Sequence, residues 1–563
     1  MLNSTVYNAL EPAATQSKHG GTMNTANRRE FIQAAATLAP LAVAPALAKA
    51  QRFAQLGSDQ FDYVIAGAGH NSLLCAAYLA KGGSSVLVLE GRTMIGGGVK
   101  TAEVLLPGFK QDLCSSNHGG FSRNPAYTDN EIPLRDFGYE LMDPEIVVHT
   151  PFLDGVAFTV FHEDIDRTVE TIEKVSPMDA QTFRRLAASR QTFLNTPRSR
   201  RGETREGRFW GRLSELSGYD AARQIWESPQ MQAANLAGGH FGGVAGSDLG
   251  TGNHAIAMIS HLGGRPMPRG GSGMLSIALG RFIEAHDGVI LTGKPVGRLT
   301  IERGRCVGVE CDDGSRYRAR KGVVSTIHVM HLVEMAPREL WGDEFLDVLD
   351  IWQPEHAMFA FHFALSESPR YDSALGGTIA PCEASIMQRP ESIFVLNADH
   401  ARGELNIDDY PLQIVHPSNI DSTRVPAGFA SVKIEGTMPY ALKEGPEHWD
   451  AIKEQVADQL LTHYLAHTSN LRKEHVLARV LMSPLDIERM NPHMWRGSVH
   501  QRLRTFDNYA PYRLPIPGLY QTGGCTEGGG SVTGVPGRAA AALILEDDGK
   551  SIEQVAAQSS RRA

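Results

Sequence analysis

Residues 61–92 read FDYVIAGAGHNSLLCAAYLAKGGSSVLVLEGR, and this stretch constrains the fold more than any other part of the chain. The apolar run from Tyr63 to Ala66 precedes a turn with two glycines, and small and apolar residues follow it. A second apolar run, from Val86 to Leu89, ends in Glu90. A strand, a glycine turn, a helix and a second strand in this order are typical of a βαβ unit in a parallel sheet. The pattern predicts an α/β fold built on a Rossmann-type dinucleotide-binding domain.

The glycine turn and the acidic residue each have a physical role in such a unit. Gly67 permits the tight turn, and Gly69 lets the backbone approach a pyrophosphate at the positive end of the helix. Ser72 takes the third position of G-x-G-x-x-G and is small enough for close packing, while Glu90 is placed to accept ribose hydroxyls. A glycine-rich loop in an ordinary α/β fold is the alternative interpretation. The predicted cofactor-binding residues of this unit are Gly67, Gly69, His70, Asn71, Ser72, Glu90, Gly91 and Arg92.

A second glycine loop, Ile95 to Gly98, follows the acidic residue directly. In flavoproteins of this kind such a loop runs along the pyrophosphate and the flavin, whereas an NAD-only domain has no need of it. We therefore predict FAD as the cofactor, with Gly97 and Gly98 among its contacts.

A third glycine-rich segment lies near the other end of the chain. Residues 518–547 read GLYQTGGCTEGGGSVTGVPGRAAAALILED, which predicts a strand that ends in glycines and then a helix over Ala539 to Leu545. Most of the chain separates this segment from the first motif, yet one dinucleotide can contact both.

The elements between the motifs predict two interleaved domains. The FAD-binding domain is expected from residues 58–125, 268–335 and 485–550. An α+β substrate-binding domain is expected from residues 126–267 and 336–484.

The first fifty residues resemble an export signal. Asn27 to Ile32 reads NRREFI, which is similar to a twin-arginine motif, and an apolar stretch over residues 34–47 precedes small-x-small cleavage sites. The stretch is too short to span a bilayer comfortably. We expect residues 1–50 to be read by the twin-arginine (Tat) translocase, which carries folded proteins to the periplasm. A disordered tail is the alternative.

Charge and cysteine spacing exclude some partners. The formal charge of −9 argues against nucleic-acid binding. The six cysteines have neither C-x-x-C nor metal-ligand spacing, so we predict no metal site. Residues 198–212 carry six arginines, which we interpret as a mobile surface loop or as a contact with anionic lipid headgroups at a membrane surface.

Four segments together resemble the phytoene desaturase-like flavoproteins, a family that includes carotenoid desaturases, retinol saturases and a pyridine nucleotide-disulfide oxidoreductase domain branch. They are GAGHNSL (67–73), EGRTMIGGG (90–98), PRGGSGML (268–275) and the run over residues 518–540. The resemblance implies FAD at a domain interface. It places Val296 at the adenine, and Gly523 and Gly524 at the ribityl chain. It places Gly534 and Val535 at the flavin pyrimidine oxygen.

Three residues are candidates for catalysis. Family members often carry His-Pro where this chain has Glu527-Gly528, so Glu527 is a candidate base or polar anchor. A solvated or backbone-capping carboxylate is the alternative. His118 and His261 are candidates for the substrate face, although a buried structural histidine is the simpler interpretation.

These features predict an exported FAD-dependent dehydrogenase or desaturase that oxidises a C–H bond of a hydrophobic small molecule. The periplasm lacks a nicotinamide pool, so oxygen or a quinone is the expected electron acceptor. A flavin amine oxidase is one alternative, because Cys525 to Glu527 also resembles that class, which requires an aromatic cage for the amine. A flavin-fold binding protein without turnover is the other.

Overall fold

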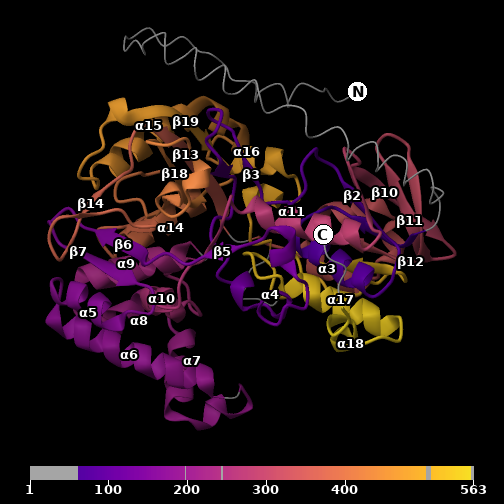
Figure 1. Cartoon of the computed structure of the whole chain (residues 1–563), viewed down its shortest axis with the longest axis horizontal. Helices are drawn as coiled ribbons and strands as arrows, with labels where there is room; N and C mark the ends of the chain where they lie inside the picture. Colours follow the sequence, from indigo (N-terminus) through magenta and orange to yellow (C-terminus); the bar gives the residue numbers. More distant parts are fainter. Residues whose placement is uncertain (1–60, 197, 242–244, 355, 502–508, 560–563) are drawn as a thin grey trace, which may run out of the picture.

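The computed structural model describes residues 61–196, 198–241, 245–354, 356–501 and 509–559. Residues 1–50, with the expected export signal, lie outside the described part. Two seven-stranded sheets organise the chain. In Figure 1 the first lies on the right with β2 and β10 to β12, and the second lies on the left with β13 and β18.

The first sheet is parallel at its centre, where β12, β1, β2 and β9 pair in that order and β20 pairs with β12. The antiparallel strands β10 and β11 extend it on one side. Its strands are β1 (Phe61–Ala66), β2 (Val86–Glu90), β9 (Val289–Thr292), β10 (Val296–Glu302), β11 (Arg305–Cys311), β12 (Arg316–Ser325) and β20 (Leu519–Gln521).

Side chains alternate between the two faces of this sheet, as the period of two in a strand requires. Tyr63 and Ile65 pack on the helices α3 (His70–Lys81), α11 (Gly273–Ala285) and α17 (Val535–Asp547). Val64 and Ala66 face the opposite side, which α12 (Val329–Leu332) and α13 (Asp343–Asp350) cover.

Helix α17 packs closely on α3 because Gly537 has no side chain. A Cβ at Gly537 would lie 2.4 Å from the backbone oxygen of Asn71 and 3.0 Å from Cβ of Leu74. This contact brings the last glycine-rich segment beside the first one, although they stand at opposite ends of the chain.

The second sheet is mostly antiparallel, with the order β19-β13-β18-β17-β16-β6-β7. Helix α15 (Trp449–Leu465) covers one side, and α9 (Pro229–His240) and α14 (Ser392–Arg402) pack against the same core. The strands are β6 (Ile146–Pro151), β7 (Ala157–Phe161), β13 (Ala357–Leu365), β16 (Glu383–Ile386), β17 (Leu412–Val415), β18 (Ala430–Met438) and β19 (Val476–Met482).

Helices α5 (Ile165–Glu173), α6 (Pro177–Asn195), α7 (Arg205–Glu215) and α8 (Gly218–Ile225) lie beside the second sheet, at the lower left of Figure 1. The interpretation of residues 198–212 as a loop is wrong over α7. Thr204 caps this helix by accepting a hydrogen bond from the amide of Gly207, and Trp210 and Leu213 are buried on its inner face. Among the described residues, no helix has the length and apolar character needed to cross a membrane.

Candidate active site

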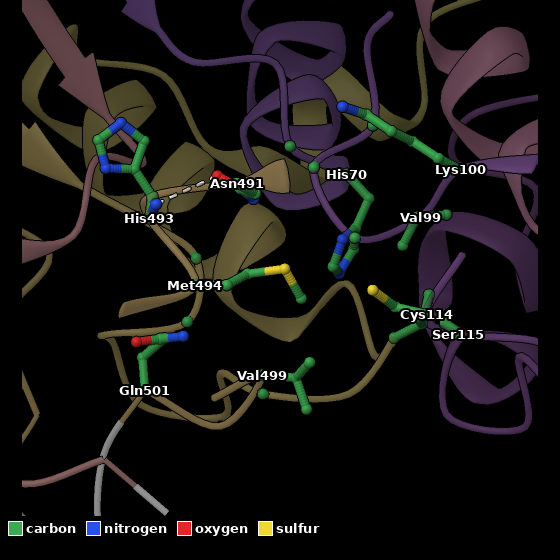
Figure 2. A pocket seen from close by; sticks show the side chains of 18 of the residues that line it. His70, Val99, Lys100, Cys114, Ser115, Asn491, His493, Met494, Val499 and Gln501 are labelled. Carbon is green, nitrogen blue, oxygen red and sulfur yellow. Dashed lines mark hydrogen bonds between the residues drawn. The ribbon is translucent and has the colours of Figure 1, made fainter. Parts of the chain in front are cut away.

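A cavity of about 740 Å³ is lined by residues from both sheets. Its volume lies within the range of about 300–1,000 Å³ that ligand pockets usually have. The three glycine segments of the sequence supply one side. In Figure 2 the side chains of His70, Cys114 and Met494 point toward one another in this space.

Thr326, directly after β12, lies between the first and last glycine motifs. A Cβ at Gly67, whose φ is +100°, would lie 2.5 Å from Thr326 Cγ2. A Cβ at Gly523, whose φ is +99°, would lie 2.5 Å from Thr326 Oγ1. Both positions require glycine for conformation and for space. Gly67 and Gly523, with the neighbouring Gly524, line the cavity as the motifs predict.

Helix α3 begins at the cavity with a free N-terminus. Gly69 is its N-cap, no side chain caps it, and its first turn holds no acidic residue. Gly69, His70 and Asn71 line the cavity, and His70 Nε2 and Asn71 Oδ1 are buried without a hydrogen-bond partner among the described residues. Burial lowers the pKa of His70 to about 4, so its ring is neutral at pH 7. A helix N-terminus of this kind favours an anionic ligand.

Ser72 explains why the third glycine of the motif is dispensable here. Its hydroxyl donates to the backbone oxygen of Gly67, at 2.7 Å, or to that of Gly69, at 2.9 Å. The side chain is fully buried, and it does not line the cavity. Ser72 therefore holds the turn in shape rather than contacting a ligand.

Glu90, at the end of β2, is oriented by two backbone amides. Its Oε2 accepts from the amide of Ala68 at 2.9 Å, and its Oε1 accepts from the amide of Arg92 at 2.9 Å. Each oxygen keeps a further lone pair, and Glu90 lines the cavity with Gly91 and Arg92. This arrangement fits a carboxylate that accepts hydroxyl groups of a ribose.

The loop after β2 lies against the first glycine turn. The amide of Gly96 donates to the backbone oxygen of Ala68 at 2.7 Å. A Cβ at Gly97 would lie 3.3 Å from Cα of Gly69. Gly97 and Gly98 line the cavity, so the loop follows the same surface as the helix N-terminus.

Val296 begins β10 at the far end of the same surface. It lines the cavity with Pro295, and a Cβ at Gly91 would lie 3.3 Å from Cα of Pro295. The predicted adenine position is therefore adjacent to the loop that carries Glu90.

Lys100 is a charged residue of this wall that the motif analysis missed. It is only 6% exposed and lines the cavity, and its Nζ makes no hydrogen bond or ion pair with a described residue. Burial lowers the pKa of Lys100, and the nearby Glu90 opposes that shift. A buried cation without a direct partner favours an anion in the cavity. The only sequence signal is a lysine two residues after the loop Gly96 to Gly98, which no glycine pattern includes.

Three predicted residues of the last motif stand away from the cavity. Glu527 is exposed and is not among the lining residues; its backbone oxygen accepts from Tyr512. Gly534 is held by packing, because a Cβ there would lie 2.7 Å from Phe121 Cε2, and Val535 is 48% exposed. Gly530, Ser531 and Val532 line the cavity in their place.

His118 and His261 stand behind the wall. Both nitrogens of His118 are engaged, with Tyr139 Oη at 2.8 Å and with Ser272 Oγ at 2.8 Å, and burial lowers its pKa to about 3. His261 Nε2 lies 2.9 Å from Nη1 of Arg265, and burial lowers its pKa well below the usual range. Neither lines the cavity. This geometry supports a positioning role for each, rather than contact with a substrate.

The opposite wall comes from the second sheet and its connections, and the sequence analysis identified none of its residues. They come from three strands and from two connections that are far apart in the sequence, so no local motif marks them. The side chains and backbone positions that form this wall are Phe241, Arg265, Met358, Gln413, Glu435, Gly436 and Thr437.

The lining residues fit FAD. The free helix N-terminus and Lys100 suit a pyrophosphate, Glu90 suits a ribose, and Gly67, Gly97 and Gly523 leave backbone surfaces without side chains. The unpartnered polar atoms of His70 and Asn71 face the same region. A single elongated dinucleotide accounts for all of these features.

Comparisons with known proteins agree with this interpretation. Residues 73–351 match the family described as flavin containing amine oxidoreductase. The chain is 26% identical to a limonene dehydrogenase chain of Castellaniella defragrans, over 88% of this chain and 96% of that protein. It is 25% identical to the rat pyridine nucleotide-disulfide oxidoreductase domain-containing protein 2, over 87% and 94%. It is 24% identical to prolycopene isomerase 2 of an Oncidium hybrid cultivar, over 72% and 69%.

Solved structures show the same fold. An oxidoreductase from Methanosarcina mazei aligns with a TM-score of 0.56 at 17% identity, over 87% of this chain and all of that one. A redesigned putrescine oxidase aligns with a TM-score of 0.57 at 14% identity, over 87% and 100%.

Fold, site and family match define the class: this protein is an FAD-dependent oxidoreductase with a mixed α/β fold. Within that class, its relatives confirm the resemblance to the phytoene desaturase-like flavoproteins. The predicted enzyme class and the predicted cofactor are thereby confirmed.

Proposed function

We propose that this chain is an exported FAD-dependent dehydrogenase or desaturase that oxidises a C–H bond of a hydrophobic small molecule. The observation that carries the proposal is one cavity bounded by the glycine motifs on one side and by the second sheet on the other. FAD, when bound, accepts a hydride. Two relatives named for limonene and prolycopene, both hydrophobic molecules, support this substrate class.

The chain's own residues orient the reactants and exclude water. Met358, Met494, Val499 and Val532 give the cavity apolar surface between its two walls. The neutral ring of His70 adds no charge next to the reacting groups. An apolar enclosure of this kind suits hydride transfer from a carbon centre, because water is kept away from the reacting atoms.

Anaerobic titration of the holoprotein tests the proposal directly. Limonene and related hydrophobic compounds should bleach the visible absorbance of the flavin, and mass analysis should find a product lighter by two hydrogens. Binding without bleaching by any of these compounds would favour the alternative of a binding protein without turnover.

A flavin amine oxidase remains the second candidate because the family match carries that description. Among the described lining residues, Phe241 is the only Phe, Tyr or Trp side chain. An aromatic cage for an amine needs more than one such ring. Bleaching by putrescine, with no bleaching by hydrophobic compounds, would favour this candidate.

The electron acceptor and the location form one linked proposal. Arg28 and Arg29 would direct the folded protein through the twin-arginine translocase to the periplasm, where oxygen or a quinone takes the electrons. Replacing both with lysine should retain the precursor in the cytoplasm, and cell fractionation checks this. A peroxide assay beside reoxidation by a quinone analogue separates the two acceptors. Delivery that is unchanged by the replacement would contradict the export proposal.

Contact with an anionic membrane surface is a further partner proposal, and α7 is its basis. Arg205, Arg208 and Arg212 are exposed on this helix, and Phe209 is 40% exposed beside them. Exposed arginines with an aromatic side chain suit lipid headgroups. Sedimentation with phosphatidylglycerol vesicles should exceed that with phosphatidylcholine vesicles, and Arg208→Glu should reduce the difference.

A further inference from the structure

The wall of the cavity that the second sheet supplies is more polar than a hydrocarbon substrate would require. Arg265, Gln413 and Glu435 all line it. Arg265 lies between α10 (Ala257–His261) and β8 (Met267–Pro268), whereas Gln413 stands on β17 and Glu435 on β18. Polar groups in a substrate wall remain favourable only when the ligand or water satisfies them.

Arg265 is held in place by two of its nitrogens. Its Nε donates to the carboxylate of Glu383 at 3.0 Å, and its Nη1 donates to Nε2 of His261 at 2.9 Å. An arginine has five N–H donors. Its Nη2 makes no hydrogen bond with a described residue, while the side chain is 20% exposed and lines the cavity.

Glu383 fixes this orientation from behind the wall. It is 1% exposed and also accepts from Gln413 Nε2 at 3.0 Å and from Asn117 Nδ2 at 3.4 Å. Burial raises the pKa of Glu383, and the positive charge of Arg265 opposes that shift. The guanidinium therefore cannot leave the wall without leaving a buried carboxylate unpaired.

The other charged group of the wall is already neutralised. Glu435 lies 2.6 Å from Nζ of Lys433, which is fully buried and also donates to the backbone oxygen of Cys114. Both charged pairs of this wall are thus balanced, and Nη2 of Arg265 is a hydrogen-bond donor at the wall that no described residue satisfies.

We propose that the substrate is amphipathic: it carries a carbonyl oxygen, in a ketone, an ester or a carboxylate, that accepts a hydrogen bond from Arg265. This inference rests on the proposed function and specifies its substrate class. A plain hydrocarbon would remove water from the guanidinium and replace it with nothing, whereas a carbonyl oxygen restores the bond. The apolar part of the substrate would then lie between Met358, Val499 and Val532.

Binding to the anaerobic holoenzyme tests the proposal, with three probes on one ring skeleton: limonene, its ketone carvone and the corresponding carboxylic acid, perillic acid. The perturbation of the flavin spectrum gives each Kd. Carvone or perillic acid should bind at least about tenfold more tightly than limonene, as expected for a hydrogen bond to a charged donor. A preference for the acid over the ketone would identify a carboxylate, and the reverse would identify a neutral carbonyl.

Variants of Arg265 test whether this residue causes the preference for oxygenated probes. Arg265→Met should abolish the advantage of the oxygenated probe, and limonene should bind somewhat more tightly because no guanidinium then loses its water. Arg265→Met with Glu383→Gln removes the unpaired buried charge and should give the same result in a protein with full flavin content. The matched control is Arg269→Met, which removes an exposed arginine that pairs with Glu140, and it should preserve the preference.

Equal binding of the three probes, absence of binding by all three, or a preference that survives both Arg265 variants would overturn the inference. The proposed function is judged separately by flavin bleaching. Bleaching by limonene without any preference for oxygenated probes would leave the proposed function standing and refute this inference. A clear preference without bleaching by any compound would refute the proposed function and leave the hydrogen bond between Arg265 and a carbonyl ligand standing.

Discussion

The side chain of Thr326 occupies the space that a side chain at Gly67 would need. A Cβ at Gly67 would lie 2.5 Å from Thr326 Cγ2, and the φ of Gly67 is +100°. Gly69, two residues later, differs in both respects: its φ is −68°, and a Cβ there would lie 3.7 Å from Thr326 Oγ1. The first glycine is therefore required by the protein itself, and the second is left for its ligand.

Gly67→Ala should destabilise the protein even without flavin. A non-glycine residue in a strained backbone conformation costs about 1–3 kcal/mol, and the contact with Thr326 adds to this cost. Chemical unfolding of the apoprotein measures the change. Adding Thr326→Ser, which removes Cγ2, should restore part of the stability. An apoprotein as stable as wild type would contradict the packing argument.

Gly69→Val should leave the apoprotein nearly as stable as wild type but abolish flavin binding. A Cβ at this position makes only ordinary van der Waals contacts in the protein, while the branched side chain would take the place of the pyrophosphate. Flavin content after purification measures the loss of binding. The unfolding curve of the apoprotein measures its stability. Full flavin occupancy in this variant would remove the front motif from the cofactor site.

The glycine turn belongs to the part of the structure that the sequence predicts well. The first sheet and the cofactor wall follow from local patterns, because Gly67, Gly69 and Glu90 stand within one strand–helix–strand unit. Arg265 could not be found in this way, since its role depends on Glu383, which stands on β16 more than a hundred residues later. The last motif did not reveal which of its residues face the cavity. Glu527 follows the buried Cys525 by two residues and is exposed.

Lys100→Met should weaken FAD binding by about tenfold to a hundredfold, as expected for loss of a hydrogen bond between charged groups. The Lys100 side chain lines the cavity and has no direct partner among the described residues, so the cofactor's pyrophosphate is its natural counter-ion. Titration of the apoprotein with FAD gives the Kd. Lys100→Arg should retain most of the affinity. Equal affinity of Lys100→Met and wild type would mean that the ammonium faces another group.

Glu527→Gln should change the rate of flavin reduction by less than about twofold, because a general base normally contributes about a hundredfold or more. The side chain is exposed and absent from the cavity wall. Stopped-flow reduction with the substrate measures the rate. A decrease of a hundredfold would restore Glu527 as a base and would require the segment after Cys525 to rearrange when substrate binds.

Acid should destabilise this protein well above the pKa of its carboxylates, because several buried histidines resist protonation. Burial lowers the pKa of His70 to about 4 and that of His118, His149 and His416 to about 3, whereas unfolded histidine has a pKa of about 6.5. The unfolded chain therefore takes up protons first as the pH falls below 6.5. Each such histidine lowers the free energy of unfolding by up to about 1.4 kcal/mol per pH unit.

The stabilisation that these neutral buried histidines provide is complete above pH 6.5. It is lost as the pH falls toward their pKa values in the folded protein. Burial raises the pKa of Glu383, so this one carboxyl group adds stability as the pH falls and opposes the effect of the histidines. Urea unfolding of the apoprotein at pH 7, 6 and 5 should show a steep decrease. His149→Phe removes one titrating group that does not line the cavity and should make the decrease shallower. A flat stability profile between pH 7 and 5 would show that these rings titrate in the folded protein with nearly the same pKa as in the unfolded chain.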